Sequence, residues 1–165
     1  MKLIEIKWEG PYTLEEISQF NSEIDYGVYQ IYGTHNILGS DTLVYIGQAI
    51  DRTFSVRLPE RGWINWDFAE YKIYIGRLGN SQACTVEEWN NDIDIAERIL
   101  IDYCQPPFNS QCLNGLSETI SNEINVLNFS KRFRLPLVVS SSWRESSYEK
   151  KQWKAYSNKM YDDLK

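Results

Sequence analysis

Two tyrosine-containing strings constrain the fold of this chain more than any other feature: Gly27-Val28-Tyr29 and Tyr45-Ile46-Gly47. Each string lies in a segment rich in Val, Ile and Tyr, which are residue types that favour β-strands. We therefore expect strands over 26–32 and 42–47. The segment 33–41 between them contains Gly, Asn, Ser and Asp, so it is predicted to be the loop of a hairpin.

The two tyrosines are the first candidates for chemistry. One antiparallel register of the hairpin places Tyr29 opposite Tyr45, and a loop of this length also allows other registers. Two adjacent phenols can position a water molecule and a phosphate oxygen. The alternative is a structural role, because the chain has 11 tyrosines and strands favour this residue. A third string, Tyr74-Ile75-Gly76, has no Gly-aliphatic-Tyr strand before it and is interpreted as core or edge strand.

The longest helix is predicted over 86–104. Thr85 and Glu88 form a capping box at its start, and Pro106-Pro107 ends it. Residues spaced by three and four form an apolar stripe on one face: Trp89, Ile93, Ala96, Leu100 and Cys104. Glu97 falls on this apolar side, where a carboxylate is costly unless it is paired or binds a metal. A carboxylate with water ligands suits Mg²⁺, and the alternative is a salt bridge at the edge of the stripe.

Arg57 lies on a predicted helical turn over 52–58 that Pro59 stops. Its guanidinium is always charged and presents a planar fork that matches phosphate. Such a group offsets the charge that develops on a phosphoryl group during transfer. The alternative is a surface salt bridge, and Arg52 and Arg61 compete for the same role.

The remaining elements predict one α/β (α+β) domain over 1–165, with a small, mostly antiparallel central sheet flanked by helices. An edge strand is expected over 4–8, and a short helix over about 14–20 begins with a capping box of Thr13 and Glu16. Later elements are strands over 69–78, 124–129 and 135–139, and a C-terminal helix over about 143–162.

Charge is distributed unevenly along the chain. The net charge is −6, yet residues 131–159 contain eight Lys or Arg residues and only two Glu. Such an asymmetry is typical of a surface for an anionic polymer, and the alternative is a solvated helix face. Lys150, Lys151 and Lys154 in this region are candidate substrate contacts.

The small numbers of histidines and cysteines limit the kinds of metal site and disulfide that the chain can form. His35 is the single histidine, so a multi-histidine zinc site is excluded. The three cysteines, Cys84, Cys104 and Cys112, lack CxxC spacing and are interpreted as buried thiols of a cytoplasmic protein. No apolar run approaches the roughly 18 residues of a membrane span, and the N-terminus is interpreted as a strand rather than a signal peptide.

Taken in order, these residues resemble the GIY-YIG nuclease superfamily over about residues 25–110. Asn109 completes the set after Pro106-Pro107-Phe108, a turn that holds its amide in place, although Asn is also common in turns. The family pattern maps onto Gly27-Val28-Tyr29, Tyr45-Ile46-Gly47, Arg57, Glu97 and Asn109. The chain departs from the pattern in a longer hairpin loop, a longer stretch before Arg57, and Arg61 where several relatives have a histidine.

The resemblance implies a GIY-YIG endonuclease-like fold, with a basic C-terminal extension over about 111–165, and hydrolysis of phosphodiester bonds. It implies that Tyr45 acts as general base and that Tyr29 orients the attacking water or a phosphate oxygen. By the same resemblance, Arg57 would neutralise the phosphoryl oxygens, Asn109 would hold the local geometry, and Glu97 would hold one divalent ion, Mg²⁺ or Mn²⁺. Nearby positions are candidate substrate contacts: Gly47, Gln48, Arg61 and His35.

The implied substrate is nucleic acid, with DNA favoured over RNA and no membrane partner. Two alternatives stay open: a non-catalytic nucleic-acid binder that kept the fold, and a protein-interaction module consistent with the acidic body of the chain. Strand type, sequence preference, biological role and oligomeric state, including a dimer, are also open.

Overall fold

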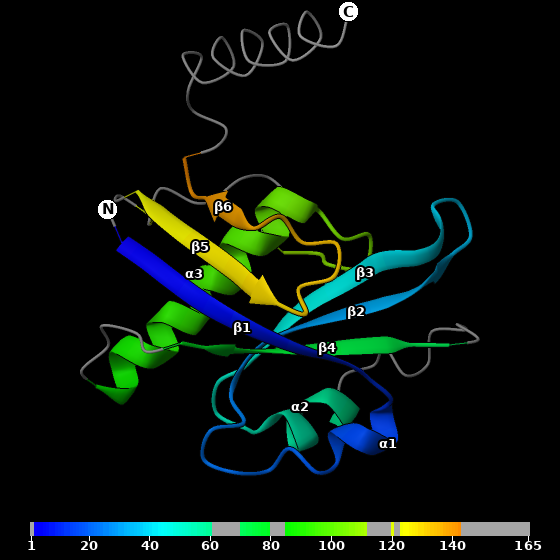
Figure 1. Ribbon diagram of the computed structural model, residues 1–165, viewed down its shortest axis with the longest axis horizontal. Coiled ribbons are helices and arrows are strands. Elements are labelled where there is room, and N and C mark those ends of the chain that lie inside the picture. The colour runs from blue at the N-terminus through cyan, green and yellow to red at the C-terminus, as the bar shows by residue number, and fades with distance from the viewer. Residues whose placement is uncertain (1, 61–69, 80–84, 112–119, 121–122, 143–165) are drawn as a thin grey trace, which may run out of the picture.

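The computed structural model describes residues 2–60, 70–79, 85–111, 120 and 123–142. These segments form one six-stranded sheet flanked by helices (Figure 1). The strands are β1 (Lys2–Tyr12), β2 (Gly27–His35), β3 (Gly39–Ala49), β4 (Lys72–Leu78), β5 (Ile124–Ser130) and β6 (Val138–Ser140). The helices are α1 (Leu14–Ile17), α2 (Phe54–Glu60) and α3 (Val86–Cys104). The expected mixed α/β class is confirmed.

The sheet has the strand order β3-β2-β4-β1-β5-β6. Every neighbouring pair is antiparallel except β1 and β5, which are parallel. The prediction that residues 4–8 form an edge strand is wrong, because β1 lies between β4 and β5. Its alternation of buried Ile4, Ile6 and Trp8 with exposed Leu3, Glu5 and Lys7 marks a strand with one open face rather than an edge.

Two cores lie on opposite faces of the sheet. The core that we call the α3 core packs Ile93, Ala96 and Leu100 of α3 against Val28 and other strand residues. The core that we call the α1–α2 core packs Ile17, Phe54 and Leu58 against the alternate residues of the same strands, including Tyr29, Ile31, Ile73 and Ile75. Figure 1 shows α3 (green) along one side of the sheet, with α1 and α2 together near β4.

The sequence predicts α3 accurately, since its two ends are marked by local signals. Thr85 accepts a hydrogen bond from the Glu88 backbone and the Glu88 side chain accepts one from the Thr85 backbone, so the capping box is present. The helix ends at Cys104, and Gln105 takes the left-handed conformation with φ of 47° before Pro106. The first capping box, of Thr13 and Glu16, also forms, but α1 stops at Ile17 and is shorter than predicted.

The β2–β3 hairpin is longer than predicted, and its register differs. Most of the segment interpreted as a loop is strand, and only residues 36–38 connect β2 to β3. The backbone N–H groups of Ile37 and Leu38 donate to His35 Nδ1, at 3.2 Å each, which closes this short connection. Tyr29 lies opposite Gly47 and Tyr45 lies opposite Ile31. Of the registers that the sequence left open, the one formed therefore differs by two residues from the one that sets the two tyrosines face to face.

The other sequence-based elements are confirmed in part. Strand β4 begins at Lys72 and β5 spans 124–130. Strand β6 has three residues, 138–140, and overlaps only the last two residues of the strand expected over 135–139. Pro59 lies inside the last turn of α2 rather than stopping it. The expected helix over 143–162, with Lys150, Lys151 and Lys154, lies outside the described residues, as do Arg61, Cys84 and Cys112. Among the described residues, no helix is sufficiently long and apolar to cross a membrane.

Candidate active site

Tyr29 and Tyr45 lie diagonally across the hairpin, on the face of the α1–α2 core. Their ring centroids are 6.1 Å apart and the ring planes differ by 33°. Tyr29 is fully buried, whereas Tyr45 is only half-buried. The ring of Tyr29 reaches across to Gly47, its partner in the register. A Cβ atom added to Gly47 would lie 2.4 Å from both Cζ and Oη of Tyr29, so this position has no room for a side chain.

Arg57 approaches the same end of β3 from α2. Its Nε donates a 3.3 Å hydrogen bond to the backbone oxygen of Gln48, the residue after Gly47. A hollow of about 200 Å³ opens here, lined by Gln48, Ile50, Asp51, Arg52 and Arg57. Arg52, a competitor for the phosphate role, forms an ion pair with Glu60. The structure therefore brings Arg57 next to the strand that holds the tyrosine pair.

The opposite face of β3 connects to α3. Gln48 Nε2 donates to Asp94 Oδ1 at 3.4 Å, and Asp94 forms an i,i+4 ion pair with Arg98 at 3.5 Å. Glu97 is half-buried and lies three residues after Asp94, so both are on neighbouring positions of one helix face. Glu97 thus belongs to the helix that covers the α3 core, whereas the tyrosines face the α1–α2 core. The two faces meet along the outer edge of β3.

Asn109 hydrogen-bonds to the backbone of β3 on that outer edge, and we call this pair of bonds the clamp. Its Oδ1 accepts from the Ile46 backbone N–H at 3.0 Å, and its Nδ2 donates to the Ile46 carbonyl at 2.8 Å. The backbone N–H of Phe108 donates to the carbonyl of Val44 at 3.1 Å. Asn109 is 7% exposed, so these bonds are shielded from water. The amide fixes the middle residue of the Tyr45-Ile46-Gly47 string to the turn after α3.

His35 lies at the other end of the hairpin from Gly47. Its Nδ1 accepts the two backbone hydrogen bonds of the connection, and its ring centroid is 5.7 Å from that of Phe108. The structure therefore does not bring this predicted contact residue to the tyrosine pair. The Tyr74-Ile75-Gly76 string is interior, between β2 and β1, and a Cβ at Gly76 would lie 2.8 Å from the Trp8 ring.

Sequence reasoning missed an ion-pair network centred on Arg77 of β4. Arg77 pairs with Asp25 at 2.6 Å and with Glu9 at 2.7 Å. Burial acts to raise the pKa of Asp25, but hydrogen bonds from Ser22 and Arg77 outweigh it, so the pKa lies below its ordinary value. The pKa of Glu9 is also lowered, because its bonds to Arg77 outweigh burial. No local spacing marks this network, since its members are far apart in sequence.

A second hollow adjoins the first. It has a volume of about 610 Å³ and shares Ile50 and Asp51 with the hollow at Arg57; its other lining residues are Glu23, Tyr26, Thr85, Val86, Trp89 and Asn90. The two hollows differ in charge, because this one contains two carboxylates and no basic side chain. Sequence reasoning also missed Asp94. It lies three residues before Glu97, and this i,i+3 spacing places the two carboxylates next to each other on one helix face, so Asp94 was detectable.

The described residues contain no group of three or more His, Cys, Asp or Glu side chains that could hold a metal ion together. A single carboxylate with water ligands, as expected at Glu97, is a different kind of site. Cys104 is a free thiol, and burial raises its pKa to about 12.

No family model, curated protein or solved structure is similar enough to this chain to count as a match.

Proposed function

We propose that this protein is a metal-dependent endonuclease that hydrolyses phosphodiester bonds in nucleic acid, with DNA favoured over RNA. The observation that carries the proposal is the tyrosine pair on β2 and β3, with ring centroids 6.1 Å apart, at the strand end where Arg57 lines a hollow. A phenol, a guanidinium and an open hollow at one strand end suit the binding of a phosphate and an attacking water.

The difference in burial between the tyrosines divides their proposed roles. Tyr45 is half-buried and can contact a substrate, so it is the general base. An ordinary phenol with a pKa of about 10 is a weak base at neutral pH, and nearby positive charge must lower this value. Tyr29 is fully buried, so it is a positioning residue that fixes the Tyr45 ring and the backbone at Gly47.

Glu97 is the proposed ligand of one Mg²⁺ or Mn²⁺. A half-buried carboxylate on a rigid helix, beside the outer edge of β3, fits a hard cation that keeps most of its water ligands. A bound divalent ion supplies charge stabilisation at the leaving oxygen. Arg57 neutralises the phosphoryl oxygens, and Asn109 holds β3 in place through Ile46. The cytoplasm stays the predicted location.

We expect wild-type protein to cut DNA in Mg²⁺ and not in EDTA. Tyr45→Phe should lower the cleavage rate at least about 100-fold, the low end for a lost acid–base group. Glu97→Ala removes the proposed metal ligand and should abolish the metal-dependent cleavage. Single-turnover assays with labelled DNA and RNA measure the rate and name the substrate. Matched controls are Tyr103→Phe and Glu87→Ala, because Tyr103 and Glu87 are exposed residues of the same α3 helix. Equal loss in a control and its test variant would show that the assay reports folding instead.

The second candidate function is a non-catalytic nucleic-acid binder. It is favoured by the full burial of Tyr29 and by the position of Glu97 on the helix that covers the other face of the sheet. Salt-dependent binding by wild-type protein, with no metal-dependent cleavage of any tested polymer, would support this candidate over the nuclease.

A further inference from the structure

The turn between β5 and β6 presents an exposed aromatic ring on a rigid base. Phe133 is 42% exposed. Its ring is stacked on that of Tyr74, with centroids 5.4 Å apart and planes within 11°, and it meets Tyr32 edge-on at 4.8 Å. The guanidinium carbon of Arg134 lies over the Phe133 ring, 5.5 Å from its centroid. An aromatic ring is thus held at the surface with a cation against it.

The backbone under Phe133 is strained. Its φ is 52°, in the left-handed region that bulky residues avoid. A conformation of this kind costs on the order of 1–3 kcal/mol and persists only where the surroundings impose it. Such positions cluster at binding sites more often than elsewhere, so the strain favours a use for the ring at the surface.

Hydrogen bonds to β1 and within the turn hold the turn in place. Asn128 is fully buried; its Nδ2 donates to the Pro136 carbonyl at 3.0 Å, and its Oδ1 accepts from Trp8 Nε1 at 3.0 Å. The Lys131 backbone N–H donates to the Trp8 carbonyl at 3.1 Å. The Arg132 guanidinium donates to the Leu135 carbonyl, so Arg132 braces the turn. The ring of Phe133 is therefore held in place before any ligand arrives.

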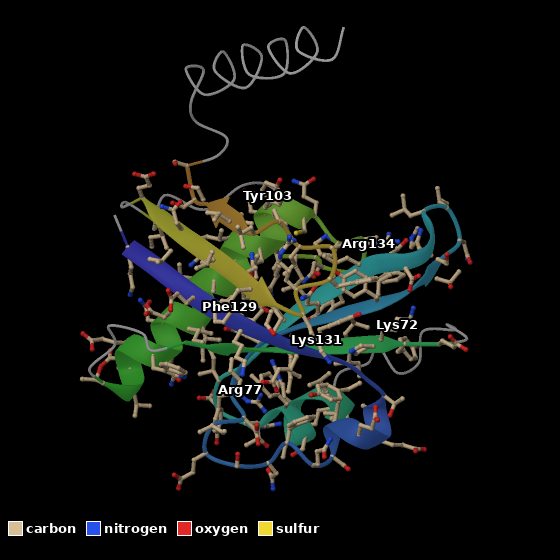
Figure 2. The ribbon with its side chains drawn as sticks, viewed as in Figure 1. Lys72, Arg77, Tyr103, Phe129, Lys131 and Arg134 are labelled. Carbon is tan, nitrogen blue, oxygen red and sulfur yellow. The ribbon has the colours of Figure 1, made fainter. Side chains whose placement is uncertain are left out.

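Basic residues are concentrated in the turn that holds this ring, in an otherwise acidic chain. Residues 130–142 contain Lys131, Arg132 and Arg134 and no acidic residue. Lys72 of β4 pairs with Asp41 at 2.6 Å, and the pKa of Asp41 is lowered first by Lys72 and also by the charge of Arg134. Arg134 and Lys72 thus act on the same carboxylate. Figure 2 labels Lys72, Lys131 and Arg134. We use the name 131–134 surface for four residues, three from the turn and one from β4: Lys131, Phe133, Arg134 and Lys72.

We propose that the 131–134 surface binds a single-stranded segment of nucleic acid. An unpaired base stacks against Phe133 and Arg134, since an aromatic ring and a guanidinium plane both accept any base. The neighbouring phosphates contact Lys131 and, in competition with its Asp41 partner, Lys72. In a duplex the bases are stacked inside the helix and cannot reach the ring, so the surface prefers single strands. The choice of polymer rests on the proposed nuclease function, but the binding itself does not require cleavage.

The test measures binding in EDTA, where no metal-dependent cleavage occurs. Fluorescence anisotropy with a labelled 20-nucleotide oligothymidylate gives the affinity of the full chain between 50 and 200 mM salt. We expect wild-type protein to bind it more tightly than a duplex of the same length. Phe133→Leu should weaken single-strand binding at least about fivefold, the lower limit for loss of one stacked base, and abolish the preference over duplex.

Two further variants separate charge from stacking and from folding. Arg134→Lys keeps the charge and loses the plane, so it should weaken binding with no change in salt dependence. Lys131→Gln should reduce the slope of log affinity against log salt by about 0.7, the value for one phosphate contact to a single strand. Lys7→Gln is the matched control. Phe133 packs on Tyr32 and Tyr74 of the α3 core, whereas Lys7 is an exposed lysine on the other face of the sheet from that core and pairs with Glu9 at 3.4 Å.

Three results would overturn the proposal: no binding of the oligonucleotide by wild-type protein at 50 mM salt, equal affinity for single strand and duplex, or surface variants that bind like Lys7→Gln. A thermal melt of each variant guards against misfolding, and Arg134→Lys tests the surface even if Phe133→Leu is unstable. Surface-dependent binding without cleavage in Mg²⁺ would refute the nuclease function alone. Cleavage with no effect of these variants would refute the surface alone.

Discussion

At the scale of single residues, the absence of a side chain at Gly47 makes room for the Tyr29 ring. Because the Tyr29 ring occupies the space where a Cβ would lie, the glycine allows the ring to cross β3 and reach the neighbourhood of Tyr45. A side chain at position 47 would displace Tyr29, which is fully buried, and close packing makes such a displacement costly.

Gly47→Ala should therefore destabilise the fold by about 1–3 kcal/mol, the usual cost of overpacking. Urea unfolding measures the change, with Ser40→Ala, an exposed position of the same strand, as the control. The double variant Gly47→Ala/Tyr29→Leu should recover part of the loss, because the clash partner is smaller. Strictly additive losses would contradict the contact between the two residues.

At the scale of elements, the turn after α3 acts as part of the sheet. Phe108 and Asn109 bond to Val44 and Ile46 of β3, where a seventh strand would otherwise lie. The strand that contains Tyr45 is consequently tied, one residue to either side of Tyr45, to the turn that follows the helix containing Glu97.

Asn109→Ala should cost about 2–4 kcal/mol of unfolding free energy, because it leaves a shielded N–H and C=O of Ile46 without partners. Hydrogen exchange should show faster exchange of the Ile46 amide. Asn36→Ala, at the exposed hairpin connection, is the control and should change stability by less than about 0.5 kcal/mol. Unchanged protection of Ile46 would contradict the clamp.

The elements also show what the sequence could and could not predict. The limits of α3 depend on signals within a few residues, the capping box at Thr85 and the prolines after Cys104, and both were visible. The hairpin register depends on how Tyr29 packs over Gly47 and on an irregularity after Ile31, and neither has a local signal. The interior position of β1 depends on β5, more than 110 residues later, so an edge strand was the natural prediction.

The residues of the candidate site also fall into those that the sequence could predict and those that it could not. The tyrosines and Arg57 lie near one strand end, as the resemblance implied, because they belong to a hairpin and the helix that follows it. The bond from Gln48 to Asp94 joins residues 46 positions apart, so spacing does not reveal it. His35 falls at the wrong end of the hairpin because the connection is shorter than predicted.

At the scale of the whole molecule, Arg77 joins three parts of the chain. It lies on β4, pairs with Glu9 on β1 and with Asp25 before β2, and its guanidinium carbon lies 5.4 Å from the centroid of the Phe20 ring. A carboxyl group with a lowered pKa in the folded state stabilises the fold above its unfolded-state pKa, and this contribution is lost as the pH falls through the folded-state pKa.

We therefore expect stability to fall as the pH drops below about 4.5, through the ordinary pKa values of 4.5 for Glu9 and 3.8 for Asp25 and beyond. Arg77→Gln should be less stable by about 2 kcal/mol at pH 7, since a shielded carboxylate loses a charged hydrogen bond. The same variant should lose less stability between pH 5 and 3 than wild-type protein does. Urea unfolding at each pH measures this, and parallel pH profiles would contradict the role of Arg77.

The clamp on β3 also bears on how the folded protein avoids self-association. A long exposed strand at the side of a sheet is a template on which another chain can add, and such addition leads to aggregation and fibres. Here Phe108, Asn109 and Arg57 occupy backbone groups of β3 at Val44, Ile46 and Gln48, while β6 at the other side is only three residues long. The contacts that position the candidate site thus also protect this side of the sheet from joining a neighbour.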